Sequence, residues 1–234
     1  MKKRTVIPYA LTLGNLLCGV LAMGVVASGW PLWQAGAFVG LGLLFDLFDG
    51  RTARALDVDG PMGAQLDSLA DVVTFGVAPA FTLHAWKLHE AGPIGLIAAG
   101  LLIAAAATRL ARFNVDAGAP KVVEGPAQFS GLAVTIPALI TLGAAAADVS
   151  IHPVMLSACA IVLAGLMVST LPYRSFKDRS VLLIVGPSAV LLALGVLWTG
   201  SLATGLGLTA ALGGTVYALS GPLCALWRRP PCAA

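Results

Sequence analysis

Long apolar segments dominate this sequence and limit what the chain can fold into. A helix needs about 20 mostly apolar residues to cross the hydrocarbon core of a bilayer. Eight segments approach that length, and they cover approximately residues 7–28, 33–55, 62–86, 93–113, 129–148, 152–171, 180–199 and 203–226. The connections between them are short and carry proline, glycine or charge. We therefore expect an all-α, polytopic integral membrane bundle of about eight transmembrane helices.

The composition excludes several other classes of protein. Of the 234 residues, 58% are hydrophobic and only 11% are charged, which does not fit a disordered chain, a collagen-like fibre or a water-soluble domain. The apolar runs are continuous, whereas the strands of a membrane β-barrel alternate polar and apolar residues. The net charge of +3 is too small to suggest nucleic acid as a partner.

The positive charges are distributed unevenly along the chain. With eight spans, 13 of the 14 Lys and Arg residues fall on one side of the membrane, and only Lys87 falls on the other. Lys and Arg are enriched in cytoplasmic connections. We therefore expect a multi-pass protein of the cell (inner) membrane with both termini in the cytoplasm.

Acidic residues cluster where the second predicted helix ends and the third begins. Asp46 and Asp49 are three residues apart, and Asp67 and Asp71 are four apart, so each pair lies on one helical face. The short connection makes the two helices antiparallel neighbours, which brings the four carboxylates together at the cytoplasmic surface. Carboxylates without His or Cys suit Mg²⁺ or Mn²⁺, with Ca²⁺ as a further option. Four of them could hold the two ions of two-metal phosphoryl chemistry.

Membrane-embedded Asp residues also occur in proton relays and ion pathways, so the residues between the two pairs decide the interpretation. Gly50 allows close approach of a ligand, Ala53 keeps the same face small, and Gly63 leaves space where the third helix begins. Arg54 can bind a phosphate with two hydrogen bonds. A phosphate-bearing substrate needs such an arginine, whereas a divalent-cation transporter, the distant alternative, does not.

The segment from Asp46 to Asp71 reads D-x2-D-G-x2-A-R-x8-G-x3-D-x3-D. It resembles the signature of the CDP-alcohol phosphotransferase family at all eight fixed positions and every spacing. Three further stretches resemble the phosphatidylserine synthase branch of that family: Gln65 to Ala80, Arg109 to Asn114 and Tyr173 to Lys177. We expect one domain over residues 1–234 with its motif core at 46–71. The last two predicted helices, about 180–226, carry no motif and are expected to be peripheral.

The resemblance implies transfer of a phosphatidyl group from CDP-diacylglycerol to the hydroxyl of L-serine, with release of CMP. It also implies two divalent cations, a homodimer, and an active site at the cytoplasmic face among membrane lipids. Asp71 would be the general base. The resemblance assigns metal binding to Asp46, Asp49, Asp67 and Asp71, and binding of the CDP group to Asp49, Gly50, Ala53, Arg54 and Gly63.

The stretch from Phe129 to Ala133 departs from the usual family pattern, so the sequence leaves more than one acceptor open. Glycerol phosphate or inositol phosphate as acceptor, or an archaeal CDP-lipid as donor, stays open. Serine carries a carboxylate, so its pocket should contain a cation. The candidate serine-binding residues are Arg109 and Arg112 first, then Asn114, Asn15 and Lys177. Basic residues at helix ends also extend to lipid headgroups, and Asn15 could instead bond between helices.

Overall fold

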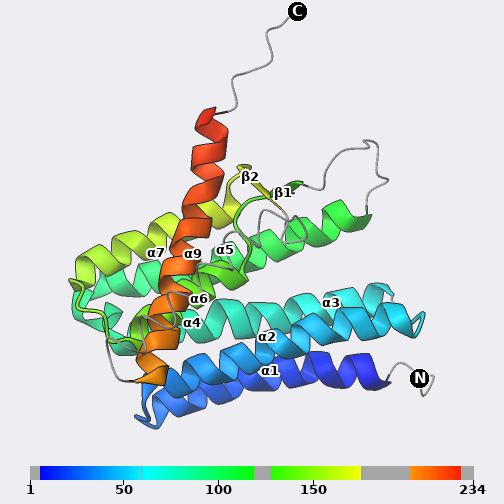
Figure 1. Ribbon diagram of the computed structural model, residues 1–234, viewed down its shortest axis with the longest axis horizontal. Helices are drawn as coiled ribbons and strands as arrows, with labels where there is room; N and C mark the ends of the chain where they lie inside the picture. The colour runs from blue at the N-terminus through cyan, green and yellow to red at the C-terminus, as the bar shows by residue number, and fades with distance from the viewer. Residues whose placement is uncertain (1–5, 59, 119–127, 175–200, 228–234) are drawn as a thin grey trace, which may run out of the picture.

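The computed structural model describes residues 6–58, 60–118, 128–174 and 201–227. In this part of the chain nearly every residue is helical (Figure 1). The longer helices are α1 (Val6–Ala27), α2 (Leu32–Ala55), α3 (Pro61–Asp71), α4 (Ala78–Trp86), α5 (Pro93–Gly118), α6 (Thr135–Ala146), α7 (Pro153–Val168) and α9 (Leu202–Trp227). Two short helical segments, η2 (Val72–Val77) and η3 (Leu88–Ala91), and two strands, β1 (Gln128–Ser130) and β2 (Pro172–Arg174), complete the described elements.

Five helical segments of the described part are long and apolar enough to cross a membrane. They are Val6–Ala27, Leu32–Ala55, Pro61–Trp86, Pro93–Asp116 and Leu202–Pro222. The expected class, a helical membrane protein, is therefore confirmed. Helices α6 and α7 are apolar but shorter, and the predicted span 180–199 lies outside the described residues. The count of about eight spans and the cytoplasmic termini stay predictions.

The fifth predicted span begins later than expected. We predicted helix from residue 129, but Gln128–Ser130 pairs antiparallel with Pro172–Arg174, a short exception to the all-α prediction. Gly131 then turns with φ +80°, and a Cβ there would collide with the carbonyl oxygen of Met167, so the turn requires glycine. Helix α6 has only 12 residues and is about 18 Å long. The apolar run is continuous, but its first residues belong to a strand and a turn.

The third membrane segment combines three helical geometries. It begins with Pro61 at the first helical turn, a position that favours proline. Directly after Asp71 the hydrogen-bonding widens to a π-helix over Val72–Val77, before α4 continues the segment to Trp86. Short π segments are frequent at functional sites, and this one carries the buried side chain of Thr74.

The last described helix, α9, packs closely on α6. The two backbones meet at Gly143 and Gly207, where a Cβ on Gly207 would lie 2.7 Å from the carbonyl oxygen of Gly143. Further along α9, Tyr217 stacks on Tyr173 of β2 with ring centroids 5.8 Å apart. Burial of the Tyr173 side chain raises its pKa to about 12. The helix is thus joined to the strand pair, although its expected peripheral position relative to the motif core stays a prediction.

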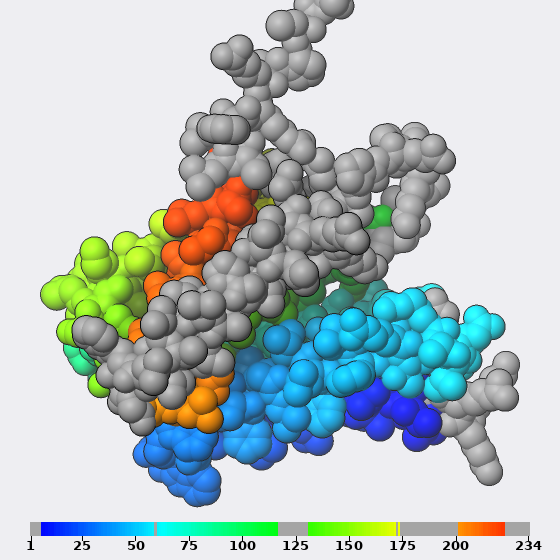
Figure 2. All heavy atoms as spheres, in the orientation of Figure 1, coloured from blue at the N-terminus to red at the C-terminus, as the bar shows by residue number. Residues whose placement is uncertain are grey.

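Helix α2 lies at the surface in Figure 2. Its outward side chains include the exposed Leu41, Leu44 and Leu47, which suit a lipid-facing or subunit-facing side. Figure 1 shows that the first turn of α1, the last turn of α2, the first turn of α3 and the last turns of α5 lie toward the same end of the molecule. The motif core is therefore at one end of the bundle.

Candidate active site

Three carboxylates from two helices meet at this end of the bundle. Asp46 and Asp49 on α2 and Asp67 on α3 each contribute an oxygen atom, and these atoms lie within 4.8 Å of one another. Asp49 is buried, and the other two are half-buried. Asp67 Oδ1 is buried and has no hydrogen-bond partner among the described residues. An all-carboxylate group with an unsatisfied buried oxygen fits a hard divalent cation.

Asp71, the fourth predicted carboxylate, lies one helical turn beyond Asp67 and is not in that close group. Its side chain is buried, and its Oδ1 accepts a 3.0 Å hydrogen bond from Nδ2 of Asn15. Asp71 still interacts electrostatically with Asp46 and Asp67. The four acids therefore form one electrostatic unit, with three close together and Asp71 deeper in the bundle.

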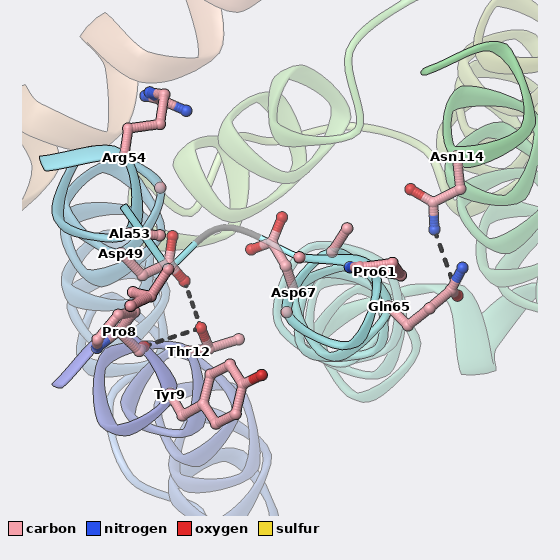
Figure 3. Close-up of a pocket in the computed structure, with 15 residues that line it drawn as sticks. Pro8, Tyr9, Thr12, Asp49, Ala53, Arg54, Pro61, Gln65, Asp67 and Asn114 are labelled. Atoms are coloured by element: carbon pink, nitrogen blue, oxygen red, sulfur yellow. Dashed lines mark hydrogen bonds between the residues drawn. The ribbon is translucent and has the colours of Figure 1, made fainter. Parts of the chain in front are cut away.

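A pocket of about 550 Å³ opens beside the carboxylates, within the usual size range for small-molecule sites. Five residues predicted to bind the CDP group line it together: Asp49, Gly50, Ala53, Arg54 and Gly63. Figure 3 shows Asp49 and Asp67 facing the space between α2 and α3, with Arg54 at the end of α2. The structure thus brings the glycine, alanine and arginine positions of the motif to a single cavity.

Helix α1 supplies pocket residues that sequence reasoning missed. Tyr9 and Thr12 both line the pocket, and the Thr12 hydroxyl donates a 2.7 Å hydrogen bond to Asp49 Oδ2. The available signal was a polar residue inside an otherwise apolar span. Gln65 of α3 also lines the pocket and was not singled out.

The residues predicted to bind the substrate L-serine are distributed around this site. Asn114 lines the pocket and donates a 2.9 Å hydrogen bond to the Ser68 hydroxyl. Asn15 is fully buried at Asp71. Lys177 lies outside the described residues.

The two arginines at the end of α5 do not line the pocket. Arg109 interacts electrostatically with Asp71, and its buried Nε has no hydrogen-bond partner in the described part of the chain. Arg112 instead donates hydrogen bonds of 3.4, 2.9 and 3.2 Å to the carbonyls of Met167, Val168 and Ser169. The two residues, three positions apart, therefore have different surroundings.

Comparison with known proteins agrees with the geometry. The model of the CDP-alcohol phosphatidyltransferase family matches residues 5–213. A Bacillus subtilis protein named CDP-diacylglycerol–serine O-phosphatidyltransferase is 32% identical over 175 residues, which are 74% of this chain and 93% of the relative. Proteins of the same name from Helicobacter pylori and Methanocaldococcus jannaschii are 31% and 30% identical, over 73% and 84% of this chain and 72% and 87% of their own lengths.

The matched region contains the whole carboxylate group and the pocket beside it. The close carboxylate group and the pocket contain seven of the eight fixed positions of the motif, and Asp71 interacts electrostatically with the carboxylates. The chain is an enzyme that belongs to the CDP-alcohol phosphatidyltransferase family.

Proposed function

We propose that this enzyme transfers the phosphatidyl group of CDP-diacylglycerol to the hydroxyl of L-serine, giving phosphatidylserine and CMP. The observation that carries the proposal is the single pocket lined by Asp49, Gly50, Ala53, Arg54 and Gly63 beside the carboxylates. The names of the relatives from three organisms support serine as the acceptor.

The pocket suits the CDP half of the donor. Gly50 and Ala53 carry little or no side chain, so a nucleoside can approach the backbone of α2 closely. The guanidinium of Arg54, an exposed residue at the pocket wall, can bind a phosphate with two hydrogen bonds. Gly63 widens the opposite wall, on α3. These residues bind and orient the donor.

The carboxylates suit two divalent cations, Mg²⁺ or Mn²⁺, with Ca²⁺ as a further option. Asp46, Asp49 and Asp67 would hold them, with Asp71 at the deeper edge of the group. When bound, such cations neutralise a diphosphate and favour departure of the CMP phosphate.

Asp71 is the proposed general base. The serine oxygen forms a bond to the lipid-side phosphorus, the bond from that phosphorus to the CMP oxygen breaks, and the serine proton passes to a carboxylate oxygen of Asp71. The Asn15 amide holds Asp71 Oδ1, which leaves the other oxygen to take the proton.

Arg109 is the first candidate to bind the carboxylate of the substrate L-serine. Its buried Nε has no partner among the described residues, and its charge interacts with Asp71, so it combines an unsatisfied donor with closeness to the base. Arg112, Asn114, Asn15 and Lys177 stay further candidates. Of the three that the structure describes, only Asn114 lines the pocket.

The reaction requires a membrane location, because the donor is a lipid while serine and CMP are water-soluble. We place the enzyme in the cell membrane, with the site at the cytoplasmic face and both termini in the cytoplasm, on the distribution of Lys and Arg. A homodimer is part of the proposal, and the exposed apolar face of α2 is compatible with a subunit contact.

An acceptor panel tests the proposed function. Purified protein is incubated with CDP-diacylglycerol, Mn²⁺ and one acceptor at a time: L-serine, glycerol phosphate or inositol phosphate. We expect CMP release when L-serine is the acceptor, and none with glycerol phosphate or inositol phosphate. Release with a phosphorylated acceptor in place of serine would move the enzyme to another branch of the family. Metal flux into proteoliposomes without CMP release from any acceptor would instead favour a cation transporter.

A further inference from the structure

Helix α1 contributes two buried polar side chains to the site, and each contacts a carboxylate from a different helix. Thr12 and Asn15 are three residues apart, so they lie on one face of α1. Their exposed fractions are 4% and 0%. Thr12 contacts Asp49 of α2, and Asn15 contacts Asp71 at the end of α3. One face of α1 is therefore hydrogen-bonded to both helices that carry the carboxylates.

The Thr12 bond is well placed to hold Asp49 in one orientation. The hydroxyl lies 2.7 Å from Asp49 Oδ2 and 3.1 Å from the carbonyl oxygen of Pro8. A hydroxyl has one proton to donate, and a distance near 2.7 Å is typical of a donor bonded to a carboxylate. Because Thr12 holds Oδ2, the orientation in which the Asp49 carboxylate meets a cation depends on this hydrogen bond.

The Asn15 side chain is itself held in place. The hydroxyl of Thr74, in the π segment after Asp71, donates a 2.8 Å hydrogen bond to the backbone carbonyl of Asn15. Asn15 in turn donates to Asp71 Oδ1 at 3.0 Å. The two hydrogen bonds thus link α1 to the segment that carries Asp71, and rotation of the Asp71 carboxylate would break the one from Asn15.

Two glycines make room for this arrangement. A Cβ on Gly42 of α2 would lie 2.9 Å from Asn15 Oδ1 and 2.8 Å from Thr74 Cγ2. A Cβ on Gly19 of α1 would lie 2.7 Å from Thr74 Oγ1. All three distances are shorter than side-chain carbons tolerate, so the polar contacts depend on glycine at these positions.

We infer that Thr12 and Asn15 are positioning residues: Thr12 orients Asp49 for cation binding, and Asn15 orients Asp71 for proton transfer. This inference rests on the proposed function, and it gives Asn15 a different role from the predicted contact with serine. Removal of a group that orients a metal-binding side chain commonly weakens metal binding about 10- to 100-fold. We expect a loss of Mn²⁺ affinity of about this magnitude when the Thr12 hydroxyl is removed.

The test of Thr12 measures Mn²⁺ binding to the purified full-length protein without substrates. Thr12→Val keeps the side-chain shape and removes the hydroxyl, and Thr12→Ser keeps the hydroxyl. We expect Thr12→Val to bind Mn²⁺ about 10- to 100-fold more weakly and Thr12→Ser to bind within about threefold of wild type. The matched control is Thr82→Val, because Thr82 is also fully buried but its hydroxyl donates to its own helix, at the Ala78 carbonyl.

The test of Asn15 separates positioning from serine binding. For Asn15→Ala we expect kcat to fall about 100-fold, in the range typical of a disturbed general base, while KM for serine stays within about twofold. A large rise in KM at unchanged kcat would overturn the positioning role of Asn15. Equal Mn²⁺ affinity in Thr12→Val and wild type would overturn the role of Thr12. Wild-type Mn²⁺ binding without CMP release from any acceptor would instead overturn the proposed function.

Discussion

Arg112, near the end of α5, donates a 2.9 Å hydrogen bond to the carbonyl oxygen of Val168, the last residue of α7. The neighbouring carbonyls of Met167 and Ser169 accept from the same guanidinium. The last carbonyls of a helix have no partner within the helix and need one elsewhere, so Arg112 completes the end of α7. Gly131 lies against this contact, since a Cβ there would be 2.9 Å from Arg112 Nη2.

This contact predicts that Arg112 contributes to stability. In Arg112→Lys the charge remains, but an ammonium cannot reproduce the planar set of donors. We expect a lower thermal unfolding midpoint in detergent, corresponding to about 1.5–3 kcal/mol for hydrogen bonds from a charged group. Arg51→Lys, at an exposed site on α2, is the control. If Arg112→Lys unfolds like wild type but has a raised KM for serine, Arg112 binds substrate and its contact with α7 is secondary.

Arg54 gives a prediction about the donor. Arg54→Ala removes the guanidinium from the pocket wall, so we expect KM for CDP-diacylglycerol to rise about tenfold or more, as for the loss of a charge-assisted phosphate contact. KM for serine should not change. Arg51→Ala is a matched control, because Arg51 is on the same helix and does not line the pocket. Equal effects of the two substitutions would mean that only the overall positive charge matters.

Asp71→Asn tests the general base directly. An asparagine keeps the shape of the side chain and an oxygen that can accept from Asn15, but it cannot take a proton. We expect CMP release to fall about 10²- to 10⁴-fold, with an unfolding midpoint close to that of wild type. Turnover at the wild-type rate would remove Asp71 from the mechanism.

Gly42 tests how closely the polar contacts of α1 depend on backbone space. In Gly42→Ala the new methyl group would lie within 2.9 Å of Asn15 Oδ1. We expect a loss of about 1–3 kcal/mol from overpacking, together with reduced CMP release because Asn15 is displaced from Asp71. Gly40→Ala is the control on the same helix, since a Cβ on Gly40 has no neighbour within 4 Å in the described part of the chain. Similar behaviour of both variants would mean that α1 and α2 can separate without effect on the site.

The helices and the carboxylate group could be predicted because both depend on local properties. Apolar length defines a membrane segment, and spacings of three and four place Asp46 with Asp49 and Asp67 with Asp71. The short connection between α2 and α3 then leaves few ways to arrange the two pairs. Asp71 is the instructive exception, because same-face spacing did not bring it into the close group.

Other features depend on partners far away in the chain, which no local pattern reveals. The apolar residues after Gln128 look like the start of a helix in the sequence. They form a strand instead, because Gln128–Ser130 pairs with the distant Pro172–Arg174. The contact of Arg112 with Val168 joins residues 56 positions apart. Thr12 and Asn15 were visible as polar residues in an apolar span, but which carboxylate each one contacts depends on how α1 packs against α2 and α3.

The crossing of α6 and α9 at Gly143 and Gly207 yields a final prediction, about the part of the chain that carries no motif. In Gly207→Ala the new Cβ would lie 2.7 Å from the carbonyl oxygen of Gly143 and 3.1 Å from the backbone nitrogen of Ala147. Backbone atoms cannot move aside as a flexible side chain can, so we expect α9 to shift, with a loss of about 1–3 kcal/mol. Gly213→Ala is the matched control on α9, because a Cβ there meets no described residue within 4 Å. Since Tyr217 of α9 lies near Arg109, a shift of α9 should also raise KM for serine more than KM for CDP-diacylglycerol. A lower unfolding midpoint with both KM values unchanged would show that α9 supports the fold without reaching the acceptor side of the site.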